Sequence, residues 1–227
     1  MRNGSATPHS DLPAPECSAF DHGARSGFNA WFFTAFDRYI NHIARHHKQA
    51  AYTGIRPGST VLEIGAGVGA NLGYLPDAVH LIAVEPNRRM VGALERRCRE
   101  RGIPVRVIAA GAEAIPLPDA SVDEVICSLV LCTVEDPARV LAEVRRVLRP
   151  GGRFRYVEHV AGRGLRRVVQ RTLRRPWAWL FEGCQLDRHT VELVAAAGFS
   201  CVDAAARRLR RSVFYPVNSA VWGTAEA

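Results

Sequence analysis

A glycine-rich segment at residues 61–69, VLEIGAGVG, is the part of the sequence best suited to binding a ligand. The apolar residues that open it predict a buried strand at 60–64, and the glycines follow where this strand turns into a helix. Gly65 and Gly67 have no Cβ, so the backbone can turn tightly there and approach a ligand closely. Glycine loops of this kind also bind dinucleotides, so the pattern alone does not identify the ligand.

Two glutamates beside this loop indicate which ligand it binds. Glu63 lies two positions before Gly65, and Glu85 directly follows the next predicted strand, at 81–84. In dinucleotide folds an acid in the place of Glu85 accepts hydrogen bonds from ribose hydroxyls. Glu63 would repel a pyrophosphate but attract an ammonium or a sulfonium. S-adenosylmethionine carries both of these cations and a ribose, and it is the cofactor that the pair favours; the structural alternative for Glu63 is a pair with an arginine.

His159 is the candidate proton acceptor. It lies near the carboxyl end of a predicted parallel strand at 154–160, where ligands bind in such sheets. An imidazole with a pKa of about 6.5 can accept a proton at neutral pH. A histidine that is only hydrogen-bonded in the rim of the sheet fits the sequence equally well. Glu158 is expected either to orient the imidazole or to pair with an arginine.

Alternating strands and helices must position these groups. Hydrophobic patterns predict further strands at 105–109, 122–129, 199–205 and 213–223, and helices at 87–101, 137–148, 165–173 and 188–197. Pro150-Gly151-Gly152 is expected to end one helix, and Asp187 to cap another. Alternating units of this kind predict an α/β fold, with a mainly parallel seven-stranded sheet and helices on both faces.

The N-terminal part has a different composition. Residues 1–27 are rich in Pro, Ser, Ala and Gly and are predicted to be a poorly ordered arm. Residues 28–50 are predicted to form a helical cap, with a helix at 28–48, on a single domain at 28–227. The chain has no run of eighteen apolar residues and no apolar signal-peptide stretch near its start, which predicts a cytoplasmic protein.

The net charge is +8, and Lys48 is the only lysine, so nearly all of the basic residues are arginines. Their densest clusters are at 163–175 and 207–211. Compositional bias explains this excess, and so does an anionic partner such as a nucleic acid, a lipid surface or an acidic substrate.

Further motifs follow the glycine loop in order: AVEPN, GAEAIPLPDASVDEVICSLVL and EVRRVLRPGG. With them, residues 60–159 resemble the Rossmann-like class I S-adenosylmethionine-dependent methyltransferases. The resemblance implies a cofactor site that also includes Pro86 and Ser128, with the methionine part at Gly65, Ala66, Gly67 and Asn71, the ribose at Glu85, and adenine at Gly111, Ala112 and Glu113. Many relatives have Asp where Gly111 stands, so backbone contacts to adenine are expected there.

A narrower resemblance extends toward the C-terminus. SLVLCTVEDPARVLAEVRRVLRPGGRFRYVEHV and PWAWLFEGCQLDRHT are similar to the methyltransferase-like 7 family, the thiol S-methyltransferases, with Gln185 and Asp187 as departures. That family carries an N-terminal hydrophobic anchor, and no counterpart of it is expected here. The resemblance implies methylation of a small-molecule thiol, with S-adenosylhomocysteine as the second product. The expected acceptor site consists of Tyr39, Leu131, Trp177 and Phe181, with His159 as the base; for Trp177 and Phe181, plain core packing is the alternative to a pocket wall.

No metal site is predicted. The six cysteines include no Cys-x-x-Cys pair and are expected to be reduced thiols, neither zinc ligands nor a disulfide framework. Cys132 and Cys184 are interpreted as packing thiols, because methyl transfer needs no covalent enzyme intermediate. His42 and His46 lie one helical turn apart, but no acidic neighbour completes a metal site, so a solvated helix face is expected.

Three other functions stay open at this point. The segment 164–179 is basic on one side, apolar on the other and rich in tryptophan, which suits methylation of a lipid or quinone through peripheral membrane contact. The arginines suggest a nucleic-acid methyltransferase. However, residues 128–131 are SLVL, where amino-directed nucleic-acid enzymes carry Asn/Asp-Pro-Pro-Tyr, so no stable nucleic-acid partner is predicted. The third is a non-catalytic binder of the cofactor. The sequence does not indicate an oligomeric state.

Overall fold

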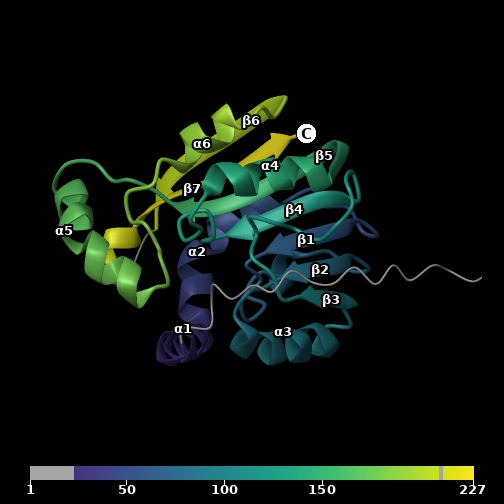
Figure 1. Cartoon of the computed structure of the whole chain (residues 1–227), viewed down its shortest axis with the longest axis horizontal. Coiled ribbons are helices and arrows are strands. Elements are labelled where there is room, and N and C mark those ends of the chain that lie inside the picture. The colour runs from purple at the N-terminus through teal and green to yellow at the C-terminus, as the bar shows by residue number, and fades with distance from the viewer. Residues whose placement is uncertain (1–22, 210–211) are drawn as a thin grey trace, which may run out of the picture.

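A computed structural model describes residues 23–209 and 212–227, and it contains one seven-stranded sheet (Figure 1). The strands are β1 (Thr60–Ile64), β2 (His80–Val84), β3 (Val105–Ile108), β4 (Val122–Ser128), β5 (Leu148–His159), β6 (Cys201–Arg208) and β7 (Ser219–Glu226). Their spatial order is β3-β2-β1-β4-β5-β7-β6. β7 is antiparallel to both of its neighbours, whereas the pairs from β3 to β5 are parallel. The predicted mainly parallel α/β sheet is confirmed.

Helices cover both faces of this sheet (Figure 1). α2 (Asp37–Tyr52) and α3 (Arg88–Glu100) pack on one face, and α4 (Pro137–Val147) and α6 (Thr190–Ala196) on the other. Side chains of β1 alternate between the two cores: Leu62 joins the core beneath α4, and Val61 the core beneath α2 and α3. Glu63 points to the same side as Val61 and is fully buried, an arrangement that needs a functional or structural reason.

The predicted N-terminal helix at 28–48 is two helices. α1 (Ala24–Ala35) and α2 meet at Phe36, which ends the first and precedes the second. Asp37 lies in the first turn of α2, where a negative charge stabilises a new helix start, and its carboxylate accepts a hydrogen bond from Asn41. Because α1 begins at Ala24, the predicted boundary of the arm falls inside a helix; residues 1–22 of that arm lie outside the described part of the chain.

The end of α2 is fixed to the middle of the sheet. Arg155 on β5 forms a buried ion pair with Glu124 on β4, at 2.7 Å, and its guanidinium also donates to the carbonyls of Ala51 and Thr53. The Tyr52 hydroxyl donates to the carbonyl of Cys127 at the end of β4. These bonds fix the last turn of α2 and therefore the residues one turn earlier.

Several predicted boundaries are wrong. β5 begins at Leu148 rather than 154, because Leu148 already pairs with Val122 on β4, and a register shift before the next pair, Glu124 with Arg153, accommodates Pro150-Gly151-Gly152. The cap of α6 is His189 and not Asp187. The last two strands lie a few residues later than predicted. None of these shifts changes the order of the elements.

α5 (Leu165–Leu180) extends beyond the end of the sheet and buries an unexpected face (Figure 1). The sequence predicts an apolar side and a basic side; Leu165 and Val168 on the apolar side are exposed, whereas Arg166 and Gln170 are buried. The Gln170 amide accepts from the backbone N–H of Gly162 and donates to two carbonyls, those of Val160 and Pro216. Hydrogen bonds to the adjoining loops therefore attach α5 to the rest of the protein.

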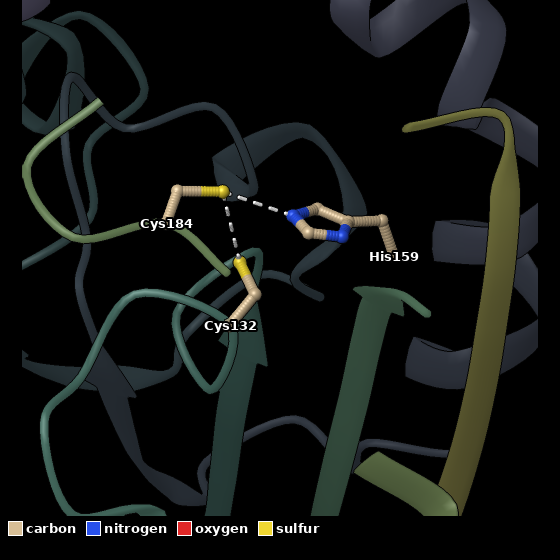
Figure 2. Close-up of side chains that lie close together, drawn as sticks. All are labelled: Cys132, His159 and Cys184. Atoms are coloured by element: carbon tan, nitrogen blue, oxygen red, sulfur yellow. Dashed lines mark hydrogen bonds between the residues drawn. The ribbon is translucent and has the colours of Figure 1, made fainter. Parts of the chain in front are cut away.

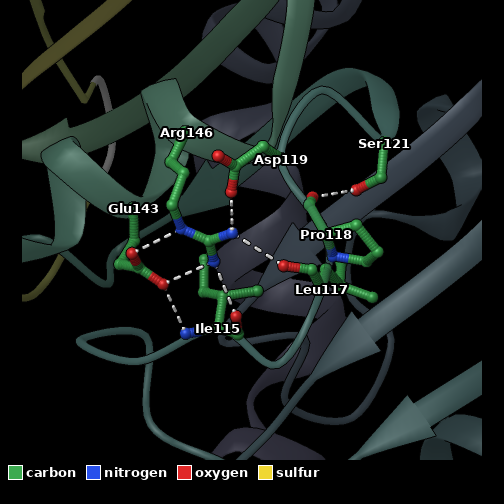
Figure 3. A network of polar contacts seen from close by, with 7 residues as sticks. All are labelled: Ile115, Leu117, Pro118, Asp119, Ser121, Glu143 and Arg146. Atoms are coloured by element: carbon green, nitrogen blue, oxygen red, sulfur yellow. Dashed lines mark hydrogen bonds and ion pairs between the residues drawn. The ribbon is translucent and has the colours of Figure 1, made fainter. Parts of the chain in front are cut away.

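A polar network orders the segment 115–121 (Figure 3). The Arg146 guanidinium pairs with Glu143 and Asp119, each at 2.7 Å, and donates to the carbonyls of Ile115 and Leu117. Glu143 also accepts from the backbone N–H of Ile115. This network fixes the chain just after residues 111–113, the segment that the resemblance places beside adenine.

Candidate active site

A cavity of about 260 Å³ lies at the carboxyl ends of the parallel strands. The sheet forms its floor, and α1, α2, α5 and the short helix η3 (Tyr215–Val217) contribute its walls. Most of the site residues expected from the sequence line it: Gly65, Ala66, Gly67, Asn71, Glu85, Pro86, Gly111, Ala112, Glu113, Ser128, His159, Trp177 and Phe181. The βα crossovers thus bring together residues that are about a hundred positions apart, as expected for a parallel sheet.

The glycine loop needs its glycines. Gly65 has φ 62°, and a Cβ there would lie 2.4 Å from Val130 Cγ2. Its backbone N–H donates to the carbonyl of Val84 on the neighbouring strand, at 2.8 Å. Gly67 has φ 55° and lines the cavity. The loop therefore passes close under the cavity, and a side chain at Gly65 would displace it.

Glu63 lies directly behind this loop. The Asn71 amide donates to its Oε1 at 2.7 Å, while Glu63 Oε2 and Asn71 Oδ1 are buried without a hydrogen-bond partner among the described residues. Burial raises the pKa of Glu63 to about 7. No arginine pairs with Glu63 in the described part of the chain, which disfavours the structural alternative. Two unused acceptors, one of them a carboxylate oxygen, suit a cationic ligand group.

Glu85, at the end of β2, is bound by backbone donors. Its Oε2 accepts from the N–H of Gly67 at 2.7 Å, and its Oε1 accepts from the N–H of Asn87 at 2.8 Å. Burial raises the pKa of Glu85 to about 7. A carboxylate oxygen can accept more than one hydrogen bond, so this fixed group can also receive hydroxyl donors from a ligand.

Lys48 is a cavity residue that the sequence analysis missed. It is fully buried on α2, and its Nζ donates to Asn41 Oδ1 at 2.7 Å. Burial lowers the pKa of Lys48 to about 8. None of the ion pairs between described residues includes it. The sequence does contain one signal for this residue: Lys48 is the only lysine, and the other residues of the Lys and Arg set are all arginines.

The opposite end of the cavity holds His159 with two thiols (Figure 2). His159 Nε2 lies 3.0 Å from Cys184 Sγ, which lies 3.8 Å from Cys132 Sγ. All three side chains are buried and line the cavity. The five cysteines within the described residues are free thiols. However, the interpretation of Cys132 and Cys184 as packing thiols misses that they lie beside His159.

Glu158 has neither of its expected roles. Its carboxylate accepts hydrogen bonds from the backbone N–H groups of Val130, Leu131 and Cys132, at 2.7 to 3.3 Å. Leu129, the first residue after β4, has φ 61°, which is uncommon for leucine. Glu158 therefore fixes the turn that follows β4 and presents Cys132 to the cavity.

Two expected acceptor residues do not line the cavity. Leu131 is fully buried in the core on the α4 side, because the turn held by Glu158 directs its side chain away from the cavity. Tyr39 packs against Phe214 at the outer side, and its hydroxyl accepts from the N–H of Val213. Trp177 and Phe181 do form the wall, together with Phe32, Phe33 and Phe214, which the sequence analysis did not single out.

The histidine pair on α2 behaves as expected. His42 and His46 are exposed on α2, on the solvated helix face that was predicted. His47 is buried; its ring packs against Trp222, and its Nε2 lies 3.3 Å from the carbonyl of Arg207. His47 therefore packs against the sheet.

Comparisons with known proteins agree with this geometry. Residues 62–156 match the family model described as a methyltransferase domain. The chain is 38% identical over 146 residues to thiol S-methyltransferase TMT1A of Homo sapiens, an alignment covering 62% of this chain and 60% of that protein. The chain thus spans about 60% of the length of this curated relative.

Two solved structures share the fold. One is an S-adenosylmethionine-dependent methyltransferase of Thermotoga maritima, described as a possible histamine N-methyltransferase, with a TM-score of 0.64, 21% identity, and coverage of 89% of this chain and 99% of that one. The other is phosphoethanolamine N-methyltransferase 2 of Haemonchus contortus in complex with S-adenosylmethionine, with a TM-score of 0.65, 12% identity, and coverage of 88% and 59%. The resemblance seen in the sequence is confirmed: residues 62–156 match a methyltransferase domain, and the chain shares the Rossmann-like fold of these solved methyltransferases.

Proposed function

We propose that this protein transfers the methyl group of S-adenosylmethionine to a small-molecule thiol. One observation carries the proposal: a single cavity joins Asn71, whose buried Oδ1 has no partner among the described residues, and Glu85 at the glycine loop to an apolar chamber that ends at His159. The first end suits the cofactor, and the second suits an apolar acceptor.

The chain offers a complementary group for each part of the cofactor. The unpaired atoms of Glu63 and Asn71 suit its ammonium, and Lys48 suits its carboxylate. Glu85 suits the ribose hydroxyls, and residues 111–113 suit adenine. When bound, S-adenosylmethionine supplies a methyl group that its sulfonium already activates. The protein then has mainly to hold the nucleophile in line with that methyl and to exclude water.

The acceptor end has an aromatic wall and one basic group. Phe32 stacks on Phe36 and packs edge-on against Phe181 and Phe214, so α1, α5 and the C-terminal segment close over the cavity together. His159 is the group that receives the proton of the acceptor. A thiol suits such a weak base, because its pKa of about 8.5 is close to that of an imidazole, whereas an alcohol holds its proton far more tightly.

The similarity to the human thiol S-methyltransferase supports the same acceptor class. The matched control is a set of acceptors that differ only in the reacting atom. We expect an alkyl or aryl thiol to be methylated faster than the corresponding alcohol, phenol and amine, with formation of S-adenosylhomocysteine as the readout. Faster methylation of a phenol or an amine than of every thiol tested would contradict the thiol assignment.

Methylation of a lipid or quinone is the second candidate, and the outer face of α5 favours it. Leu165, Val168 and Trp179 are more than half exposed there, amid arginines that face solvent. Trp31 on α1 is also 59% exposed. Exposed apolar and basic side chains on one helix suit peripheral contact with an anionic membrane. No described helix is long and apolar enough to cross a membrane.

Flotation with vesicles tests this contact. We expect binding to vesicles that contain phosphatidylserine, and weaker binding after Trp179→Ser and Val168→Ser. Equal flotation of the variant and the wild type would exclude α5 as the contact.

A stable nucleic-acid complex is not expected, and a cytoplasmic location remains a prediction of the sequence.

A further inference from the structure

Three separate segments bring two thiols and an imidazole together at the acceptor end (Figure 2). The ligand-competent atoms of Cys132, His159 and Cys184 all lie within 4.8 Å of one another, and all three residues are buried. Thiols are weak hydrogen-bond donors and acceptors, so their mutual contacts add little stability. Two soft sulfur ligands and one nitrogen ligand in one place are, however, a donor set that zinc prefers.

The distance between the two sulfurs fits a tetrahedral ion. Two thiolates at about 2.3 Å from a zinc ion, in tetrahedral geometry, have their sulfurs about 3.8 Å apart. The sulfur atoms of Cys132 and Cys184 are 3.8 Å apart. A nitrogen ligand at about 2.0–2.1 Å from the ion lies about 3.5 Å from each sulfur, so the 3.0 Å contact between His159 and Cys184 would widen by about half an ångström. We propose that Cys132, His159 and Cys184 bind one zinc ion.

Hydrogen bonds already hold the three segments in place. The carbonyl of Cys132 accepts from the N–H of Gln185 at 2.7 Å, which joins the two cysteine-bearing segments. Glu158, the neighbour of His159 on β5, accepts from the N–H of Cys132. Trp177 Nε1 donates to Cys184 Sγ at 3.3 Å. Such outer contacts orient ligands and lower the cost of assembling a metal site.

Charge and coordination number point to an open site. On binding, the two thiols release two protons, and two thiolates with one divalent ion form a neutral unit, which suits the apolar wall. Three protein ligands leave the fourth tetrahedral position free, the pattern of catalytic zinc sites. Because all three ligands line the cavity, that position is reached from the cavity.

The fourth position gives the ion a task in methyl transfer. An acceptor thiol that binds there releases its proton to solvent and is held as a zinc-bound thiolate. This step rests on the proposed thiol acceptor. The ion would take over the ionisation of the acceptor, which His159 performs in the ion-free protein.

Metal content and zinc affinity test the site without reference to turnover. We expect one zinc ion per chain in the wild type, by elemental analysis and by competition with a chromophoric chelator. Cys132→Ser and Cys184→Ser should each weaken zinc binding by more than about a hundredfold, since even outer contacts are worth ten- to a hundredfold. Cys98→Ser, in the buried core of α3, and Cys201→Ser, on the surface, are matched controls and should bind zinc normally. Cobalt in the same site should show thiolate-to-metal charge-transfer absorption that both ligand variants lack.

Two results would overturn the site. One is equal zinc binding by the wild type and a folded Cys184→Ser variant, with circular dichroism as the test of folding. The other is a wild type that binds no zinc. This outcome includes a wild type in which two thiols can be titrated only after a reductant is added, because Cys132 and Cys184 would then form a disulfide. Thiol methylation by a protein that binds no zinc would overturn the site alone. Zinc binding without thiol methylation would leave the site standing and contradict the proposed function.

Discussion

The two ends of the cavity are built in different ways. The cofactor end is polar and lies at consecutive strand ends: the Glu85 carboxylate accepts from the backbone N–H of Gly67, and the Glu63 carboxylate accepts from the Asn71 amide. The acceptor end is aromatic and sulfur-rich and comes from segments far apart, among them α1, β5 and the loop after α5. The centre of the cofactor end therefore lies in one short stretch of chain around the glycine loop, whereas the acceptor end is assembled from distant segments at the periphery of the fold.

Replacing His159 should have the largest effect and should act at the acceptor end alone. In protein treated with a chelator, His159→Ala should lower thiol turnover by roughly ten- to ten-thousand-fold, the range for loss of a positioned base. The deficit should shrink as pH rises, because the acceptor thiol ionises increasingly without help. Affinity for S-adenosylhomocysteine should stay unchanged. The measurement is a rate-versus-pH profile of both proteins with one thiol; parallel profiles would show that His159 is not the base.

Glu85→Ala should act at the cofactor end alone. Losing the charged acceptor for the ribose hydroxyls should weaken S-adenosylmethionine binding by on the order of 1–3 kcal/mol, or about five- to a hundred-and-fifty-fold. Calorimetry on the folded variant measures this loss. Unchanged affinity would remove Glu85 from the ribose site. A change in the preference among acceptors would show that the two ends are not independent.

The sequence predicted one end of the site much better than the other. The glycine loop, Glu63 and Glu85 are local signals, because strand, turn and acid follow one another along the chain. The contact of Cys132 and Cys184 with His159 is not local, since 52 positions separate the two cysteines, and no Cys-x-x-Cys pattern marks them. Leu131 shows the converse error: its position near the motif suggested a wall residue, but Glu158 holds the backbone so that the side chain enters the core.

The fold shows the same division. The order of strands and helices follows from apolar periodicity, and it was predicted correctly. The buried face of α5 could not be predicted from periodicity, because the three backbone partners of the Gln170 amide lie in the adjoining loops. The break at Phe36 was missed since both helices continue the same aromatic spacing across it.

A substitution of Lys48 tests the contact with the amino-acid part of the cofactor separately from the rest of the cofactor site. Lys48→Met keeps the apolar stem and removes the ammonium, so it should weaken binding of S-adenosylhomocysteine roughly tenfold, the worth of a charged hydrogen bond. Methylthioadenosine lacks the amino-acid part and is the control ligand; its affinity should not change. Equal losses for both ligands would mean that Lys48 supports the fold of the cavity and does not contact the carboxylate.

The smallest expected effect is a pH dependence of stability caused by the buried acids. The pKa of Glu63 is about 7 in the fold, whereas an unfolded glutamate ionises near about 4.3. Between these values the folded state holds a proton that the unfolded state has released, so the free energy of unfolding falls as pH rises. One group of this kind contributes roughly 1 kcal/mol between pH of about 5.5 and 6.5.

Glu63→Gln isolates this contribution, because the amide keeps the shape without titrating. His47, whose pKa is lowered by burial, gives a slope of opposite sign in the same window, but it does so equally in both proteins. Asp123 and Glu143, whose pKa values are lowered, titrate below the window.

We therefore expect the wild type to lose about 1 kcal/mol more than Glu63→Gln over this pH unit, measured by urea unfolding without cofactor. Saturating S-adenosylmethionine should reduce the difference, since its ammonium favours the ionised carboxylate. If the free energy of unfolding changes equally with pH in the two proteins, Glu63 is ionised in the empty cavity and Lys48 is its counter-charge. The charges at the cofactor end would then be balanced before any ligand binds.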